Sequence, residues 1–319
     1  MADLIDLSSH SVTTVLNILL KDRTTNKNII LATEEYGNGT TFNTQITKAL
    51  LFNTNINIKP RVAKTLEEQS KRTRNKAEVF SPSWLCNKMN NHCDDEWFER
   101  KNVFNFEENH NWKVNEEKIV FPNNKSWKDY VMSTRLEITC GEAPYLVSRY
   151  DTVTGEIIPI NKRIGFLDRK LRVINENTKT RKSWNQWVYR AFESIYGYEY
   201  QGDNLLIARV NLLKTFCEYT RDKWNEEPTQ TSLKRVAEII SWNIWQMDGT
   251  YDVVPYAGAI YYQDDFDLYQ MNMFEFIDFE NELYRAEMPS NTVECKIYDW
   301  QDNKEISFKS MKEGTTHEI

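Results

Sequence analysis

Two long stretches of the chain carry apolar residues at the spacing of an amphipathic helix. The first begins at Asp203 or Asn204, and either side chain is suited to cap a helix start. Two shorter stretches also look helical. We therefore predict helices over residues 60–77, 183–194, 203–224 and 232–247, and a short helix or strand over 11–20.

Other segments are short and apolar, or alternate between apolar and polar residues, as strands do. The clearest is Arg135 to Thr139, which runs into a tight turn at Cys140–Gly141. We predict strands over residues 28–33, 135–139, 195–200, 250–262 and 293–308. The acidic, aromatic stretch 264–287 fits a helix, a loop or a poorly ordered insert. Because strands alternate with amphipathic helices, we expect an α/β fold.

The composition is that of an ordinary globular protein. Of the 319 residues, 40% are hydrophobic and 13% aromatic, which argues against a disordered chain. The longest apolar runs, such as Val15 to Leu20, are far too short to cross a bilayer, and the first residues lack the pattern of a signal peptide. The five cysteines form no regular framework, so we expect a cytoplasmic protein with reduced thiols and no membrane partner.

The net charge of −7 conceals an uneven distribution along the chain. Residues 59–76 carry a local charge of +5 and residues 161–190 carry +7, whereas residues 248–287 carry −9. Basic segments with aromatic residues suit contact with nucleic-acid phosphates, although a solvated helix face is the usual alternative. The side chains that we select for nucleic-acid contact are Lys71, Arg72, Arg74, Arg169, Lys170 and Arg172.

Four short segments, in a fixed order, offer the chemistry of a nucleoside site. Phe80 and Pro82 supply an apolar wall, and Gly141 lets the backbone approach a ligand at the end of a strand. Glu199, at the end of a later strand, can accept two hydrogen bonds from ribose hydroxyls. Asp248 can accept one from the exocyclic amine of adenine.

These segments resemble the adenine-specific DNA methyltransferases that use S-adenosylmethionine. The surrounding sequence, including CGEAPYLVSRYDTVTGE and YGYEYQGDNLL, resembles restriction–modification methylase subunits from phages and mobile elements of Gram-positive bacteria. The resemblance spans about residues 10–255. It implies S-adenosylmethionine as cofactor, with DNA and a restriction or defence-system protein as partners. The cofactor residues that it assigns are Phe80, Pro82, Glu137, Cys140, Gly141, Glu142, Pro144, Glu199 and Asp248.

The same resemblance implies a fold and a division of the chain. The expected fold is that of class I S-adenosylmethionine-dependent methyltransferases: Rossmann-like, with a mostly parallel sheet and helices on both faces. The core would span residues 77–262 and carry a basic insert at 150–190. Residues 1–76 would form an N-terminal extension with the first basic segment. Residues 263–319 would supply the acidic segment and the C-terminal strands.

The chain also departs from that family. It has no Asn/Asp-Pro-Pro-Tyr/Phe tetrapeptide, which in the family holds the target amine and stacks on the flipped base. Pro255–Tyr256 is the segment that most nearly matches this tetrapeptide, and it gives the only catalytic candidates. Packing of these two residues in a strand is the alternative. Ala143 stands where the family usually has a second glycine. An alternative function is therefore a catalytically degenerate methylase fold that binds DNA or protein in defence or counter-defence.

Two further kinds of chemistry have weaker support. Asp168-Arg169-Lys170 has the acid-x-Lys spacing of some nucleases, but such a tripeptide is common by chance. Cys86, His92, Cys93 and His110 fit no standard zinc spacing, so we predict no metal site. No Gly-x-x-x-x-Gly-Lys loop is present that would indicate a nucleotidase.

Overall fold

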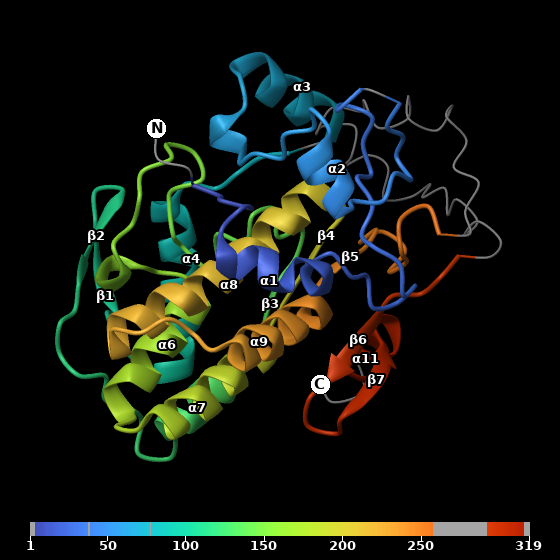
Figure 1. The fold of residues 1–319 in the computed structure, drawn as a ribbon. Helices are drawn as coiled ribbons and strands as arrows, with labels where there is room; N and C mark the ends of the chain where they lie inside the picture. Colours follow the sequence, from blue (N-terminus) through green and yellow to red (C-terminus); the bar gives the residue numbers. More distant parts are fainter. Residues whose placement is uncertain (1–3, 38, 77, 258–291, 316–319) are drawn as a thin grey trace, which may run out of the picture.

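A small parallel sheet stands at the centre of the fold (Figure 1). The computed structural model describes residues 4–37, 39–76, 78–257 and 292–315. The strands β3 (Arg135–Glu137), β4 (Ile195–Glu199) and β5 (Ile244–Gln246) lie side by side in that order. Residues 135–137 pair with 195–197, and residues 197–199 pair with 244–246, both in parallel. All three strands therefore end at one edge of the sheet.

Helices make the connections between these parallel strands, which confirms the predicted α/β class. Several are capped by hydroxyl side chains, as at Thr180, Thr229 and Ser126. The helical elements are α1 (His10–Leu19), α2 (Lys48–Asn53), η1 (Arg61–Ala63), α3 (Leu66–Lys76), α4 (Ser83–Phe98), α5 (Trp127–Met132), η2 (Ile160–Lys162), α6 (Phe166–Asn177), α7 (Arg181–Glu193), α8 (Gly202–Trp224), α9 (Gln230–Asn243) and α11 (Phe308–Thr315). Two antiparallel hairpins are formed by β1 (Asn105–Glu108) with β2 (Asn111–Val114), and by β6 (Lys296–Asp299) with β7 (Lys304–Ser307).

The two faces of the sheet are covered differently. Ile195 and Ile244 belong to the main apolar core, in which α8 packs against β4 and β5 and is flanked by α1 and α9. Tyr198 and Trp245, on the other face, pack against Phe308 of α11. The expected fold has helices on both faces, whereas this face is covered by the C-terminal hairpin together with α11. The sheet has three strands in the described part of the chain.

The predicted helix over 203–224 is confirmed by α8, and 183–194 corresponds to α7. The prediction over 232–247 is wrong at its end, because α9 stops at Asn243 and residues 244–246 form β5. Asn243 donates hydrogen bonds to the carbonyls of Phe192 and Ile195, which ties the helix end to the start of β4. Residues 244–246, which follow the helix, are buried on both faces of the sheet. A continuous apolar run of this kind fits the spacing of a helix as well as that of a buried strand.

The predicted strand over 28–33 does not form a ladder; only isolated bridges join Lys21 to Asn28 and Ile30 to Gln45. A side chain holds this segment instead. The amide of Gln246 accepts from Ile30 N and donates to Ile30 O, each at 2.9 Å, and it also donates to the carbonyl of Tyr200. The predicted strand over 250–262 does not form in its described part, because residues 250–257 make a turn with isolated bridges at Val253. Its remainder and the stretch 264–287 lie outside the described residues.

Candidate functional site

Phe80, Gly141 and Glu199 meet at the carboxyl edge of the parallel sheet. The amide nitrogen of Gly141 lies 2.8 Å from Oε2 of Glu199. A Cβ placed on Gly141 would lie 3.2 Å from two ring carbons of Phe80, so the ring rests against this glycine. Glu199 lies 58 positions after Gly141 in the chain and Phe80 lies 61 positions before it, so the fold brings distant residues together. Open parallel sheets bind their ligands at this edge.

The loop after β3 is built from alternating backbone conformations. Thr139, Gly141 and Ala143 have φ values of 46°, 53° and 64°, a region that glycine enters freely and other residues only with strain. The buried carboxyl of Glu137 closes the loop by accepting from the amides of Tyr145 and Leu146. Burial raises the pKa of Glu137 to about 8. The loop is therefore held from below by a carboxyl that is largely uncharged at neutral pH.

Glu199 supports the same loop from the neighbouring strand. Its Oε2 accepts from Gly141 N and its Oε1 accepts from Gln201 N at 3.0 Å. Burial raises the pKa of Glu199 to about 7. A carboxylate has about four lone-pair positions, so each oxygen keeps one acceptor position after these two bonds. Two such positions on adjacent oxygens suit the two hydroxyls of a ribose.

The other cofactor candidates shape the loop from inside. Glu142 is buried, accepts from Arg61 N at 2.6 Å, and also accepts from the hydroxyl of Tyr150. Cys140 packs under β4, where a Cβ on Gly197 would lie 3.3 Å from its sulfur. Pro144 is buried, and Pro82 directly precedes α4. Glu142, Cys140 and Pro144 are therefore buried beneath the loop, whereas Pro82 is partly exposed.

Asp248, Pro255 and Tyr256 lie beyond the end of β5. Asp248 Oδ1 accepts from Thr250 N, so its carboxylate closes a turn. Pro255 is buried. Tyr256 has a φ of 56°, and its ring stacks on Phe42 with centroids 5.4 Å apart. The ring of Tyr256 also lies 6.3 Å from that of Tyr200, the residue after Glu199, so this group lies beside the site.

Three of the six basic residues selected for nucleic acid are not on the surface, which corrects that part of the interpretation. Arg72, Arg169 and Lys170 are each 1–2% exposed. Arg169 pairs with Asp94 at 2.6 Å, and Lys170 donates to Ser133 O and Ser194 Oγ. Burial lowers the pKa of Lys170 well below its usual value. These side chains stabilise the interior and have no surface to offer a phosphate.

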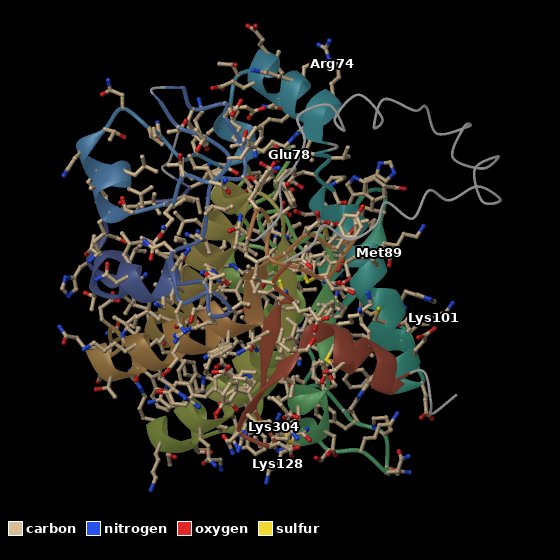
Figure 2. The ribbon with its side chains drawn as sticks, turned by 90° about the vertical axis from the view of Figure 1, so that its right-hand side faces the viewer. Arg74, Glu78, Met89, Lys101, Lys128 and Lys304 are labelled. Carbon is tan, nitrogen blue, oxygen red and sulfur yellow. The ribbon has the colours of Figure 1, made fainter. Side chains whose placement is uncertain are left out.

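The remaining three basic residues differ in exposure. Lys71 and Arg74 are exposed on α3, and Figure 2 shows Arg74 extending outward at the edge of the molecule. Arg172 is half-buried and donates to Glu176 and to the carbonyls of Asn115 and Glu117. Lys71 and Arg74 are therefore the members of the selected set that a polyanion can reach.

The nuclease interpretation also fails on burial. Asp168 accepts from the amide and hydroxyl of Ser148, and Lys170 points to Ser133 and Ser194 instead. Both side chains are 1% exposed. The two groups thus have separate partners inside the core and form no joint site.

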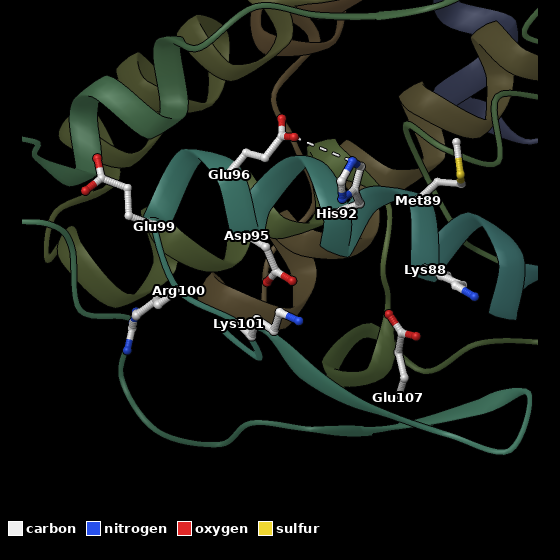
Figure 3. A pocket seen from close by; sticks show the side chains of 9 residues that line it. All are labelled: Lys88, Met89, His92, Asp95, Glu96, Glu99, Arg100, Lys101 and Glu107. Atoms are coloured by element: carbon white, nitrogen blue, oxygen red, sulfur yellow. Dashed lines mark ion pairs between the residues drawn. The ribbon is translucent and has the colours of Figure 1, made fainter.

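A separate hollow of about 760 Å³ lies along α4. In Figure 3, His92 and Glu96 point towards each other across one side of α4, with their ring nitrogen and carboxylate 3.5 Å apart. Acidic and basic side chains are mixed around the hollow, and it contains none of the predicted site residues. Among the described residues, no three His, Cys, Asp or Glu side chains gather as a metal site requires.

Sequence reasoning missed a buried ionic cluster beside this edge. Arg72 pairs with Asp203 at 2.9 Å, with Glu78 at 2.6 Å and with Glu35 at 3.0 Å. Lys64 Nζ lies 3.6 Å from Asp203. Although burial acts in the opposite direction, the charges of Arg72 and Lys64 hold the pKa of Asp203 at about 2. The only sequence signal was an acid at the start of α8.

Comparison with known proteins finds no matching family model, curated protein or solved structure. None of the helices in the described ranges combines the length and apolar character that a membrane span needs.

Proposed function

We propose that this chain is an S-adenosylmethionine-dependent DNA methyltransferase-like protein of a restriction–modification or phage system. The observation that supports it most directly is the meeting of Phe80, Gly141 and Glu199 at the carboxyl edge of the parallel sheet. An adenosyl group needs an apolar wall, a close backbone and a ribose acceptor, and these three residues supply one each.

The residues fit the cofactor in chemical terms. Glu199 keeps an acceptor position on each oxygen for the ribose hydroxyls. Gly141 has no side chain of its own, so the Phe80 ring is the group that rests against the loop at this point. Bound there, the cofactor supplies a methyl group to an exocyclic amine of DNA. The chain itself contributes orientation, because the buried carboxyl groups of Glu199 and Glu137 hold the loop in place.

A second candidate is a catalytically degenerate methylase fold that binds DNA or a partner protein. Two observations favour it. The chain lacks the Asn/Asp-Pro-Pro-Tyr/Phe tetrapeptide. The Pro255–Tyr256 pair that comes closest has its proline buried and its tyrosine ring stacked on Phe42. In this case the acidic stretch 264–287 and the exposed cations of α3 carry the interaction instead of a reaction.

Calorimetry with S-adenosylmethionine separates the two candidates. Heat of binding, followed by transfer of labelled methyl to DNA that is lost in Glu199→Ala, supports the enzyme. Binding of cofactor without transfer to any DNA supports the degenerate fold. No heat and no thermal shift at about millimolar cofactor, a weak limit for a specific site, would remove the cofactor from the proposal.

A further inference from the structure

Residues 59–76, which we call the strap, contact the candidate cofactor site through Arg61. Near the start of the strap, the amide of Arg61 donates to Glu142 Oε1 at 2.6 Å. The Arg61 guanidinium carbon lies 5.5 Å from the centre of the Phe80 ring, and this ring rests against Gly141. The strap, the ring and the loop are therefore in contact one after the other.

The helical part of the strap has almost no apolar attachment to the body. Figure 1 shows α3 at the outer edge of the fold. Leu66 is 83% exposed, and Arg72 is the one buried side chain among residues 66–74 of α3. Most helices in proteins are held by burial of an apolar face. This helix is held by ion pairs.

Arg72 reaches three carboxylates that come from three places in the chain. Asp203, in the first turn of α8, accepts two bonds from Arg72, one from Nη1 at 2.9 Å and one from Nη2 at 3.1 Å. Glu35 comes from the N-terminal segment and Glu78 from just beyond the strap. The hydroxyl of Tyr36 and the amide of Asn204 complete the set by donating to Asp203 and Glu78.

We propose that the strap is a lid over the candidate cofactor site and that Arg72 is its latch. The gating role rests on the proposed function, whereas the latch itself does not. When Arg72 leaves its carboxylates, α3 has no buried apolar surface to retain it, and Lys64, at 3.6 Å from Asp203, is the remaining ionic tie of the strap. Opening at both cations lets Arg61 move off the Phe80 ring. Ligand then has a route to Gly141 and Glu199. When the latch closes, the ring is pressed back over the glycine and water is excluded.

A polar latch is suited to opening and closing. The desolvation of five charged groups, which are Arg72, Lys64, Asp203, Glu78 and Glu35, offsets much of their mutual attraction, so the net stability of the closed form is modest. Removal of one partner, in contrast, leaves buried charges without compensation. The closed form should therefore be sensitive to Arg72 and insensitive to the exposed cations beside it.

Hydrogen–deuterium exchange of the full chain without ligand tests the latch. In Arg72→Ala, the amides of α3 should exchange at least about tenfold faster than in the wild type, while those of α8 keep their protection. Arg74→Ala is the matched control, because Arg74 lies on the same helix, is exposed, and bonds only to Ser70 in the structure as described. Equal exchange of α3 in all three proteins overturns the latch.

Should Arg72→Ala lose protection throughout α8, Glu35→Gln replaces it. Glu35 is half-buried and supplies one of the three carboxylates. Faster exchange confined to α3 in Glu35→Gln supports the latch, and unchanged exchange overturns it.

Stopped-flow binding of S-adenosylmethionine in the absence of DNA tests the lid. The variant that releases the latch, Arg72→Ala or its replacement Glu35→Gln, should bind the cofactor with an association rate constant several-fold higher than that of the wild type. An unchanged rate constant, with faster exchange of α3, overturns the lid and keeps the latch. No binding by any variant overturns the proposed cofactor site, and the exchange result then decides the latch alone.

Discussion

The amide of Gly141 donates a hydrogen bond of 2.8 Å to the carboxylate of Glu199, across the ends of two neighbouring parallel strands. This bond fixes the loop after β3 to the end of β4. It also places the only residue of the loop that lacks a side chain directly beneath the Phe80 ring.

Glu199→Ala is expected to weaken S-adenosylmethionine binding by about ten- to a hundredfold, because the ribose hydroxyls lose their acceptor. Isothermal titration calorimetry gives the affinity. Glu305→Ala, an exposed position in β7, is the control and should bind like the wild type. Equal affinity in both variants would place the ribose elsewhere.

Gly141→Ala is expected to lower the free energy of unfolding by about 1–2 kcal/mol through its left-handed backbone, and by a further amount through contact with Phe80. Gly37→Ala isolates the backbone contribution, because Gly37 has a φ of 59° and open space around its Cβ position. Urea denaturation measures both. When Phe80→Ala is the parent protein, adding Gly141→Ala should cost only the backbone contribution, because the ring is gone. If the two glycine variants lose equal stability, the ring does not press on Gly141.

Protonation of Glu199 makes stability depend on pH. Its pKa is about 7 in the folded chain and about 4.3 in an exposed glutamate. Between these values the folded chain holds a proton that the unfolded chain releases, so the free energy of unfolding falls as pH rises through this window and is level above it. Acid therefore favours this part of the fold.

Glu199→Gln carries no titrating proton and should remove that dependence. Relative to the wild type, the variant is expected to gain on the order of 1–3 kcal/mol between about pH 5 and about pH 8. Urea denaturation across this range measures the difference. Parallel profiles for the two proteins would mean that Glu199 is ionised throughout.

The double variant Lys71→Ala/Arg74→Ala is expected to weaken DNA binding and to reduce the slope of log affinity against log salt by about two, if each cation meets one phosphate. Fluorescence anisotropy at several salt concentrations gives both quantities. Lys170→Met is the control for loss of a basic residue, because Lys170 is buried. If only Lys170→Met loses DNA affinity, the DNA contact lies on α6 and not on α3.

The fold class could be predicted from sequence because α8 has a clear period and its neighbours alternate with it. The end of α9 could not, since Ile244 and Trp245 are buried on every side and satisfy both periods. The approach of Gly141 to Glu199 followed from one property: parallel strands end at a common edge. The role of Ala143 did not follow, because only the structure reveals its left-handed conformation.

The basic residues show where charge counting fails. A local charge of +7 over 161–190 indicated a surface for phosphates, yet Arg169 is paired with Asp94, which lies 75 positions away. A run of cations does not reveal acids brought in from other helices. Arg72 was misplaced for the same reason, since its partners Glu35 and Asp203 are distant in the chain.

The side chain of Gln246 has a wider consequence. Its amide reproduces the donor and acceptor of a peptide group and so holds Ile30 as a neighbouring strand would. The amide of Gly202 adds a hydrogen bond of 3.1 Å to the carbonyl of Leu31, so the end of β5 and the start of α8 together align the N-terminal segment. Glu35 lies five positions beyond Ile30, so this alignment helps to place its carboxylate beside Arg72. The side chain of Gln246 thus contributes to an ion pair in which it takes no part.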